Sequence, residues 1–161
     1  MVAVEALHSQ SQSTTPTREQ ILVRNPVTDD IIGHIEAMTA EQVQAVVARA
    51  KAAQPAWAAR PIKERCRLLL KWADLLWKHQ ATAIQRIRES TGKNAFGAWE
   101  EVAVLDSITH YYANHAPQWL APQTRRSVLP VKHTARVYYK PWGVAGFITP
   151  WNYPLLNAIQ D

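Results

Sequence analysis

An asparagine in a proline-rich loop is the residue best placed to do chemistry in this sequence. Asn152 lies between Pro150 and Pro154 and follows residues 144–149, which are almost continuously apolar. Such a run is typical of a strand buried on both faces of a parallel sheet, and open α/β sheets bind ligands beyond the carboxyl ends of their strands. The Asn152 amide could donate a hydrogen bond to a developing oxyanion. Asparagine is also a common turn former, so the residue types alone leave both interpretations open.

The single cysteine invites comparison with a catalytic nucleophile. Cys66 lies between Arg65 and Arg67, whose positive charges could activate a thiol. Its spacing to Ile62 and Leu69 nevertheless places it on the apolar side of a helix, where a thiol behaves as a small hydrophobic group. We therefore interpret Cys66 as a core residue. One cysteine cannot form an internal disulfide, so we expect a reducing, cytoplasmic setting.

The remaining titratable residues show no pattern that indicates a catalytic or metal site. No two of the six histidines have HxxxH spacing, and no cysteine or carboxylate joins them at a ligand spacing, so we expect no metal site. The acidic pairs Asp29–Asp30 and Glu100–Glu101 are adjacent in sequence. Neighbouring residues on a strand or helix point in different directions, so we interpret both pairs as solvated turn or surface.

Composition limits the class of protein. The 161 residues are 47% hydrophobic and 19% charged, as in a folded globular chain. No apolar run approaches the roughly 18 residues of a membrane span, and neither GxGxxG nor a P-loop occurs. The net charge of +5 comes largely from stripes such as Lys63, Arg67 and Lys71, which fall on one helix face. Because no nucleic-acid-binding motif accompanies these bases, we expect neither nucleic acid nor a membrane as a partner.

The pattern of the first 120 residues predicts a tail, a hairpin and four helices. Residues 8–17 are polar and low in complexity, so we expect residues 1–20 to form a disordered tail. Two β-rich runs, 21–23 and 31–35, flank turn formers and predict a hairpin. Apolar periodicity and caps predict four helices. The first runs from Thr39 to a stop at Pro55, and the second begins at Pro61. The third includes residues 84–91 and is capped by Gly92, and the fourth runs from Asn94 to Asn114 with a stop at Pro117.

The last forty residues change to a β pattern. Residues 128–131 and 135–139 are β-like and flank a turn, and the buried strand at 144–149 is followed by a loop and a helix that begins near Leu155. Strand, loop and helix form the first half of a βαβ unit. The partner strand requires a crossover of about a dozen residues or more, so we expect an α/β architecture interrupted part-way.

Several motifs resemble the aldehyde dehydrogenase superfamily. Residues 141–154 match its P-x-G-V-x-x-x-I-x-P-W-N-F/Y-P pattern throughout. Residues 25–33 are similar to the opening hairpin of that family, and residues 53–57 to its A-x-x-A-W stretch. Glu64-Arg65 with Leu68-Leu69 resembles its E-R-x-x-x-L-L helix, and Glu89 to Lys93 its E-T-G-K stretch. The resemblance covers residues 21–161 and concerns only the N-terminal portion of the family fold.

The resemblance implies a fold and a division of the chain. Residues 21–123 correspond to the N-terminal helical part of the cofactor-binding domain with its hairpin. Residues 124–140 correspond to a β-hairpin that binds neighbouring subunits in a homo- or hetero-oligomer. Residues 141–161 correspond to the first strand, the P-W-N loop and the helix start of the Rossmann-like NAD(P)-binding sheet. The expected fold class is therefore α/β, as a truncated aldehyde dehydrogenase fold.

The resemblance also implies site residues. Ile148, Thr149, Pro150 and Trp151 are expected to line the NAD or NADP site, and Asn152 to stabilise the thiohemiacetal oxyanion. The catalytic cysteine of the family, its water-activating glutamate and its ribose-contacting lysine all lie beyond the Asn loop and have no counterpart in this sequence.

The expected function is the N-terminal portion of an NAD(P)-dependent enzyme that oxidises an aldehyde to a carboxylic acid and is inactive alone. Residues 136–139 and 150–154 are similar to a succinate-semialdehyde dehydrogenase-like subgroup. Two alternatives remain open. One is an assembly or regulatory module that binds a longer homologue, and the other is a non-functional remnant with an aggregation-prone apolar segment.

Overall fold

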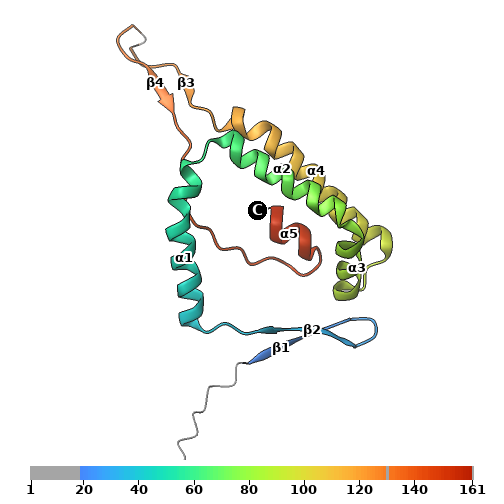
Figure 1. Cartoon of the computed structure of the whole chain (residues 1–161). Helices are drawn as coiled ribbons and strands as arrows, with labels where there is room; N and C mark the ends of the chain where they lie inside the picture. Colours follow the sequence, from blue (N-terminus) through green and yellow to red (C-terminus); the bar gives the residue numbers. More distant parts are fainter. Residues whose placement is uncertain (1–18, 130, 161) are drawn as a thin grey trace, which may run out of the picture.

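The computed structural model describes residues 19–129 and 131–160. The predicted disordered tail lies outside this range except for its last two residues, and Gln20 already belongs to the first strand. The elements follow one another as β1 (Gln20–Arg24), β2 (Ile31–Glu36), α1 (Ala40–Ala59), α2 (Ile62–Lys78), α3 (Gln80–Thr91), α4 (Ala95–Trp119), β3 (Gln123–Arg125), β4 (Ala135–Val137) and α5 (Pro154–Gln160). Figure 1 shows α2 and α4 side by side, with α5 beside α4 and the β3–β4 hairpin projecting away.

The predicted N-terminal hairpin is confirmed. Strands β1 and β2 pair antiparallel, with an irregularity between Val23 and Arg24. The Asn25 side chain caps the turn, because its Oδ1 accepts a hydrogen bond from the Val27 backbone N–H at 2.9 Å. Asp29 adopts a positive φ of 61° in the same turn, a conformation that Asp tolerates better than most residues. Local turn chemistry thus sets the register of this hairpin.

The predicted helix starts are confirmed, whereas the two predicted proline stops are wrong. Helix α1 runs through Pro55 to Ala59, and α4 runs through Pro117 to Trp119. Proline removes one backbone donor, but α1 has no buried residue, so water can hydrate the carbonyl that loses its partner. In α4, a ring contact spans the proline: the His115 ring stacks on the Trp119 ring with 5.1 Å between centroids, and its other neighbour is the tilted Tyr111 ring at 4.5 Å.

Small side chains let the core helices approach closely. Ala73 of α2 and Ala98 of α4 are both fully buried. Ile87 of α3 packs in a cluster with Ala98 and Val102, and Leu155 of α5 covers that cluster. Helix α4 therefore lies at the centre of the helical body and contacts α2, α3 and α5.

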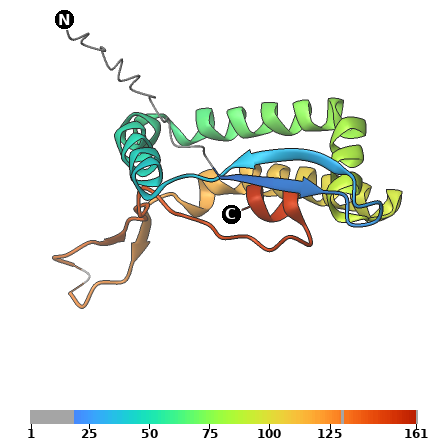
Figure 2. The same cartoon turned by 90° about the horizontal axis from the view of Figure 1, so that it is seen from below.

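The β pattern after residue 120 is only partly realised. Strand β3 lies at Gln123–Arg125, before the predicted run at 128–131, and it pairs antiparallel with β4. Residues 144–149 form no strand, although the helix predicted after them is present as α5. A strand is defined by hydrogen bonds to a neighbour, and none of the described residues lies beside 144–149 as a second strand. Figure 2 shows this segment as an open, curved chain below the helices.

The described helices do not include a membrane span. Among residues 19–129 and 131–160, none is both long enough and apolar enough to cross a bilayer.

We expect Leu105→Ala to destabilise the helical body strongly. Leu105 is fully buried at the centre of α4, and truncation of a buried leucine typically costs about 2–5 kcal/mol of unfolding free energy. Urea denaturation followed by circular dichroism measures this change. Leu75→Ala is the control, because Leu75 is 57% exposed. Equal losses from both variants would contradict the assignment of α4 as the core helix.

We expect Thr39→Ala to fray the start of α1. The Thr39 hydroxyl accepts from the Gln42 N–H at 3.3 Å, and the Gln42 side chain accepts from the Thr39 N–H at 2.9 Å. Loss of such a cap costs about 1 kcal/mol. The Thr39 side chain also lowers the pKa of Glu41, so that pKa should rise toward its ordinary value in the variant.

The pH dependence of this cap follows from the sign of that shift. A lowered pKa in the folded state stabilises the fold above the pKa of the unfolded chain, and this stabilisation is lost as pH falls through the folded pKa. NMR titration of Glu41 tests the prediction, and an unchanged Glu41 pKa in Thr39→Ala would contradict it.

Candidate functional site

The predicted site residues lie together on the loop that leads into α5. Residues 148–152 are consecutive and end at the turn that precedes Pro154, the first residue of α5. Ile148 is 104% exposed and Trp151 83% exposed, and Asn152 is also exposed. The loop therefore presents these side chains to solvent.

A buried carboxylate holds the start of α5 against α4. Glu101 of α4 is fully buried, and its Oε1 accepts hydrogen bonds from the backbone N–H groups of Leu155 at 2.7 Å and Leu156 at 3.0 Å. The first N–H groups of a helix have no partner within the helix, and the positive end of the helix dipole favours an anion. Glu101 therefore acts as a cap for α5 that is supplied from 54 residues away.

Lys93 forms an ion pair with Glu101 and so compensates its negative charge. Its Nζ donates to Glu101 Oε2 at 2.9 Å. The same ammonium group lies 3.5 Å from the centroid of the Tyr153 ring, in a cation–π contact. Lys93 is well placed for both contacts, because it lies between the Gly92 cap of α3 and the Asn94 cap of α4. Both oxygens of the buried carboxylate thus have partners, as the burial of a charge requires.

The prediction that Glu100 and Glu101 form a solvated pair is half wrong. Glu100 is exposed, whereas Glu101 is buried. The sequence contains a signal for this difference. Glu101 lies three residues after Ala98 and four before Leu105, so helical periodicity places it on the apolar face. Its partners lie far along the chain, and no local pattern identifies them.

The interpretation of Cys66 as a core residue is confirmed. The thiol is free and buried on α2, which packs against α4. In the part of the chain that the structure describes, no cluster of three or more His, Cys, Asp or Glu side chains could hold a metal ion. Because its thiol is buried, Cys66 does not provide the accessible nucleophile that an aldehyde-oxidising site needs.

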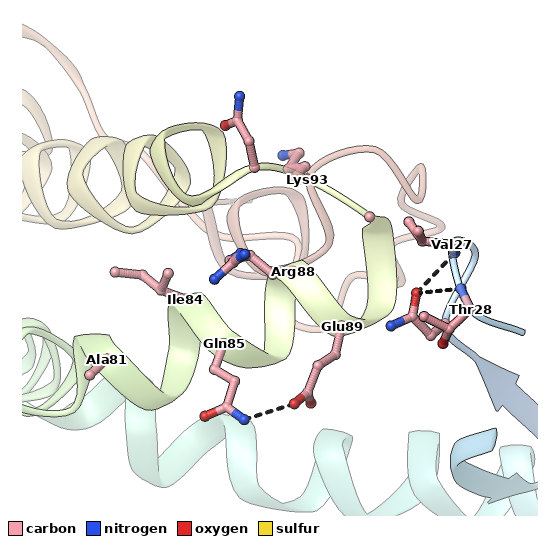
Figure 3. Close-up of a pocket in the computed structure, with 11 residues that line it drawn as sticks. Val27, Thr28, Ala81, Ile84, Gln85, Arg88, Glu89 and Lys93 are labelled. Atoms are coloured by element: carbon pink, nitrogen blue, oxygen red, sulfur yellow. Dashed lines mark hydrogen bonds between the residues drawn. The ribbon is translucent and has the colours of Figure 1, made fainter. Parts of the chain in front are cut away.

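A cavity of about 730 Å³ lies elsewhere, between the hairpin turn and α3. Figure 3 shows Val27 and Thr28 of the turn facing the end of α3, with Arg88 and Lys93 on the wall. Gly92 makes this approach possible, because its φ is +73° and an added Cβ would lie 3.0 Å from Val27 Cγ2. None of residues 148–152 lines the cavity. It is the junction of the hairpin with α3 and not the predicted site.

Residues 148–151 are open to solvent in the part of the chain that the structure describes. A cofactor site is normally a concave pocket that buries most of its ligand. Ile148 is 104% exposed, and a Cβ added at the nearby Gly146 would find no atom within 4 Å. The described residues therefore leave the segment around residues 146–151 without a surrounding pocket wall.

Comparison with known proteins places the chain in a family of enzymes. The model of the aldehyde dehydrogenase family matches residues 13–161. A relative from Mycolicibacterium smegmatis is 35% identical over all 161 residues, which correspond to 30% of that protein. A relative from Deinococcus radiodurans named succinate-semialdehyde dehydrogenase (NADP+) is 31% identical over 84% of this chain and 28% of its own length. The chain thus spans about 30% of the length of the curated relatives that it matches.

Solved structures show the same partial correspondence. A glyceraldehyde-3-phosphate dehydrogenase from Bacillus halodurans, complexed with NADP, aligns with a TM-score of 0.80 and 32% identity over 87% of this chain and 30% of its own. An NAD-dependent benzaldehyde dehydrogenase from Corynebacterium glutamicum aligns with a TM-score of 0.80 and 29% identity over 89% and 31% of the two chains. The fold of this chain is therefore part of a larger one.

We expect the Cys66 thiol to react slowly with a disulfide reagent in the folded chain and rapidly after denaturation. The thiol is buried on α2 and is therefore not accessible to solvent, and buried structural cysteines are inert. Asn152→Cys provides the control, because its new thiol on the exposed loop should react in a fast phase. A fast phase for Cys66 in the unsubstituted, folded chain would contradict its placement in the core.

Proposed function

The chain belongs to the aldehyde dehydrogenase family, and we propose that it supplies the N-terminal part of an NAD(P)-dependent enzyme that oxidises an aldehyde to a carboxylic acid. The observation that carries this proposal is the P-W-N loop, whose Asn152 is exposed directly before an anchored helix. An amide donor held at this point could stabilise the oxyanion that forms when a thiolate attacks the aldehyde carbonyl.

The thiolate and the general base of this reaction must come from other residues. Cys66 is the only cysteine and is buried away from solvent. Nucleophilic catalysis requires the thiolate, its base and its oxyanion donors at one place. We therefore propose that residues 1–161 are inactive alone and contribute the Asn152 donor to a site completed by further polypeptide.

The amount of exposed surface supports a need for further polypeptide. The accessible surface is 13605 Å² for a mass of 18.2 kDa, whereas a compact monomer of that mass exposes roughly 8,100 Å². Residues 1–18 account for at most about 2,900 Å² of the excess, even at the unfolded limit of about 1.45 Å² per dalton. The remaining excess of roughly 2,600 Å² on this one chain is on the scale of one partner's share of a large, obligate interface, which buries about 2,000–5,000 Å² or more over both partners.

The division of the chain proposed from the sequence accords with this role. Residues 21–123 form the helical part with its hairpin, and residues 141–161 supply the loop and the helix of the cofactor-binding sheet. Residues 124–140 form the proposed oligomerisation hairpin. The β3–β4 hairpin projects from the helices in both Figure 1 and Figure 2, as expected for an element that contacts another subunit. This projection also favours a second candidate function, an assembly module that binds a longer homologue.

The names of the relatives support a proposal for the substrate and cofactor classes. Because the Deinococcus radiodurans relative is named as an NADP+ succinate-semialdehyde dehydrogenase, we propose a carboxylated aldehyde as substrate and NADP or NAD as cofactor. Residues 148–151 would contribute one wall of the cofactor site. A reducing cytoplasmic setting is part of the same proposal.

The proposal is tested by mixing the purified chain with a separately expressed remainder of the Mycolicibacterium smegmatis relative. We expect NAD(P) reduction with succinate semialdehyde only in the mixture. Asn152→Ala should lower kcat by about 100- to 1,000-fold, as for loss of one oxyanion donor. Asn114→Ala, at an exposed position of α4, is the matched control and should leave kcat unchanged.

Two results would contradict the proposal. Turnover by the isolated chain would show that it is not a partial enzyme. Binding to the remainder without any turnover would favour the assembly module.

A further inference from the structure

We infer that Glu101 and Lys93 are positioning residues that hold Asn152 in one conformation. Glu101 holds the start of α5, and Lys93 contacts both Glu101 and the ring of Tyr153, the residue next to Asn152. The catalytic meaning of this inference rests on the proposed function, whereas the anchor itself can be tested without it.

The loop has no hydrogen-bonded support before Asn152. Within the described part of the chain, no hydrogen bond or ion pair involves any residue from 141 to 152. Trp142 is 101% exposed and Trp151 83% exposed, and Phe147 is also more than half exposed, so the aromatic side chains of the loop have little packing. The hydrogen bonds and charged contacts nearest to Asn152 therefore involve the residues on its C-terminal side.

Those residues are restrained at three points. The ring of Tyr153 lies under the Lys93 ammonium at 3.5 Å, and the N–H groups of Leu155 and Leu156 both donate to Glu101 Oε1. Pro154, between these contacts, has a fixed φ and restricts the backbone of the preceding Tyr153. The restraint is thus passed along a short and stiff segment to Asn152.

The anchor depends on the paired charges and not only on shape. A glutamine at position 101 would keep the volume of the side chain but would leave Lys93 beside a neutral amide. Hydrogen bonds to an ionised acceptor are roughly twice as strong as those to a neutral one. Loss of Lys93 would in turn leave the Glu101 carboxylate, which is fully buried, without its cation.

The first experiment measures the loop by NMR in the full 161-residue chain. In Glu101→Gln and Lys93→Met, we expect the Leu155 and Leu156 amides to exchange at least about tenfold faster. The backbone order parameter of Asn152 should fall from about 0.85 to below about 0.6. Amides of Ala73 and Leu105, in the core, report whether the fold as a whole is retained.

Matched variants separate the anchor from general effects of substitution. Glu100→Gln removes the adjacent, exposed carboxylate and should change neither measurement. Lys93→Arg keeps both the charge and the ring contact and should retain the ordered loop. If Glu101→Gln leaves both the exchange rates and the Asn152 order parameter unchanged, the inference is wrong.

The second experiment tests the consequence for catalysis in the mixture with the remainder of the relative. Glu101→Gln should lower kcat by about 10- to 100-fold, as misplacement of a reacting group does, and leave KM within about twofold. In the Asn152→Ala background, Glu101→Gln should cause no further loss, since there is no donor left to position. A further loss of the same size would show that Glu101 acts independently of Asn152. An inactive wild-type mixture would refute the proposed function, and the NMR measurements would still decide the anchor.

Discussion

Glu101 is buried on α4, so its charge must be compensated by groups inside the protein. The compensation comes from Lys93 at the junction of α3 and α4 and from two backbone N–H groups of α5. A buried carboxylate with both oxygens occupied resists separation from its partners, because each partner left alone would be unsatisfied. This constraint ties α5 to α4, and it places the P-W-N loop at a defined point on the helical body.

Apolar packing within the helical body supports the position of α5 on α4. Fully buried alanines on α2 and α4 permit close approach, and Ile87, Ala98 and Val102 form a cluster that Leu155 of α5 covers. Apolar packing and the polar anchor therefore act on the same helix. Packing alone would allow α5 to slide or rotate along an apolar surface, whereas two hydrogen bonds to one carboxylate fix its start. The loop before α5 is open, and its order depends on the anchored start of that helix.

The open segment at residues 144–149 shows the limit of what this chain can form within its described part. A parallel strand is stable only beside neighbours that accept and donate its backbone hydrogen bonds. The relatives are about three times as long as the matched region, and the surface exposed here exceeds that of a compact monomer. The segment at residues 144–149 is therefore open, whereas the loop is held at its C-terminal end by the contacts of Glu101 and Lys93.

Local sequence determined the features that depend on a few neighbouring residues: the N-terminal hairpin, the starts of the helices, the left-handed cap at Gly92 and the burial of Cys66. It also carried the P-W-N motif and hence the family. The helix ends beyond Pro55 and Pro117, the coil at 144–149 and the burial of Glu101 were decided by tertiary structure. The physical reason is distance along the chain. A cap or turn is satisfied within about four residues, whereas Glu101 finds its partners 54 and 55 residues away, and a strand requires a neighbour that no local pattern can provide.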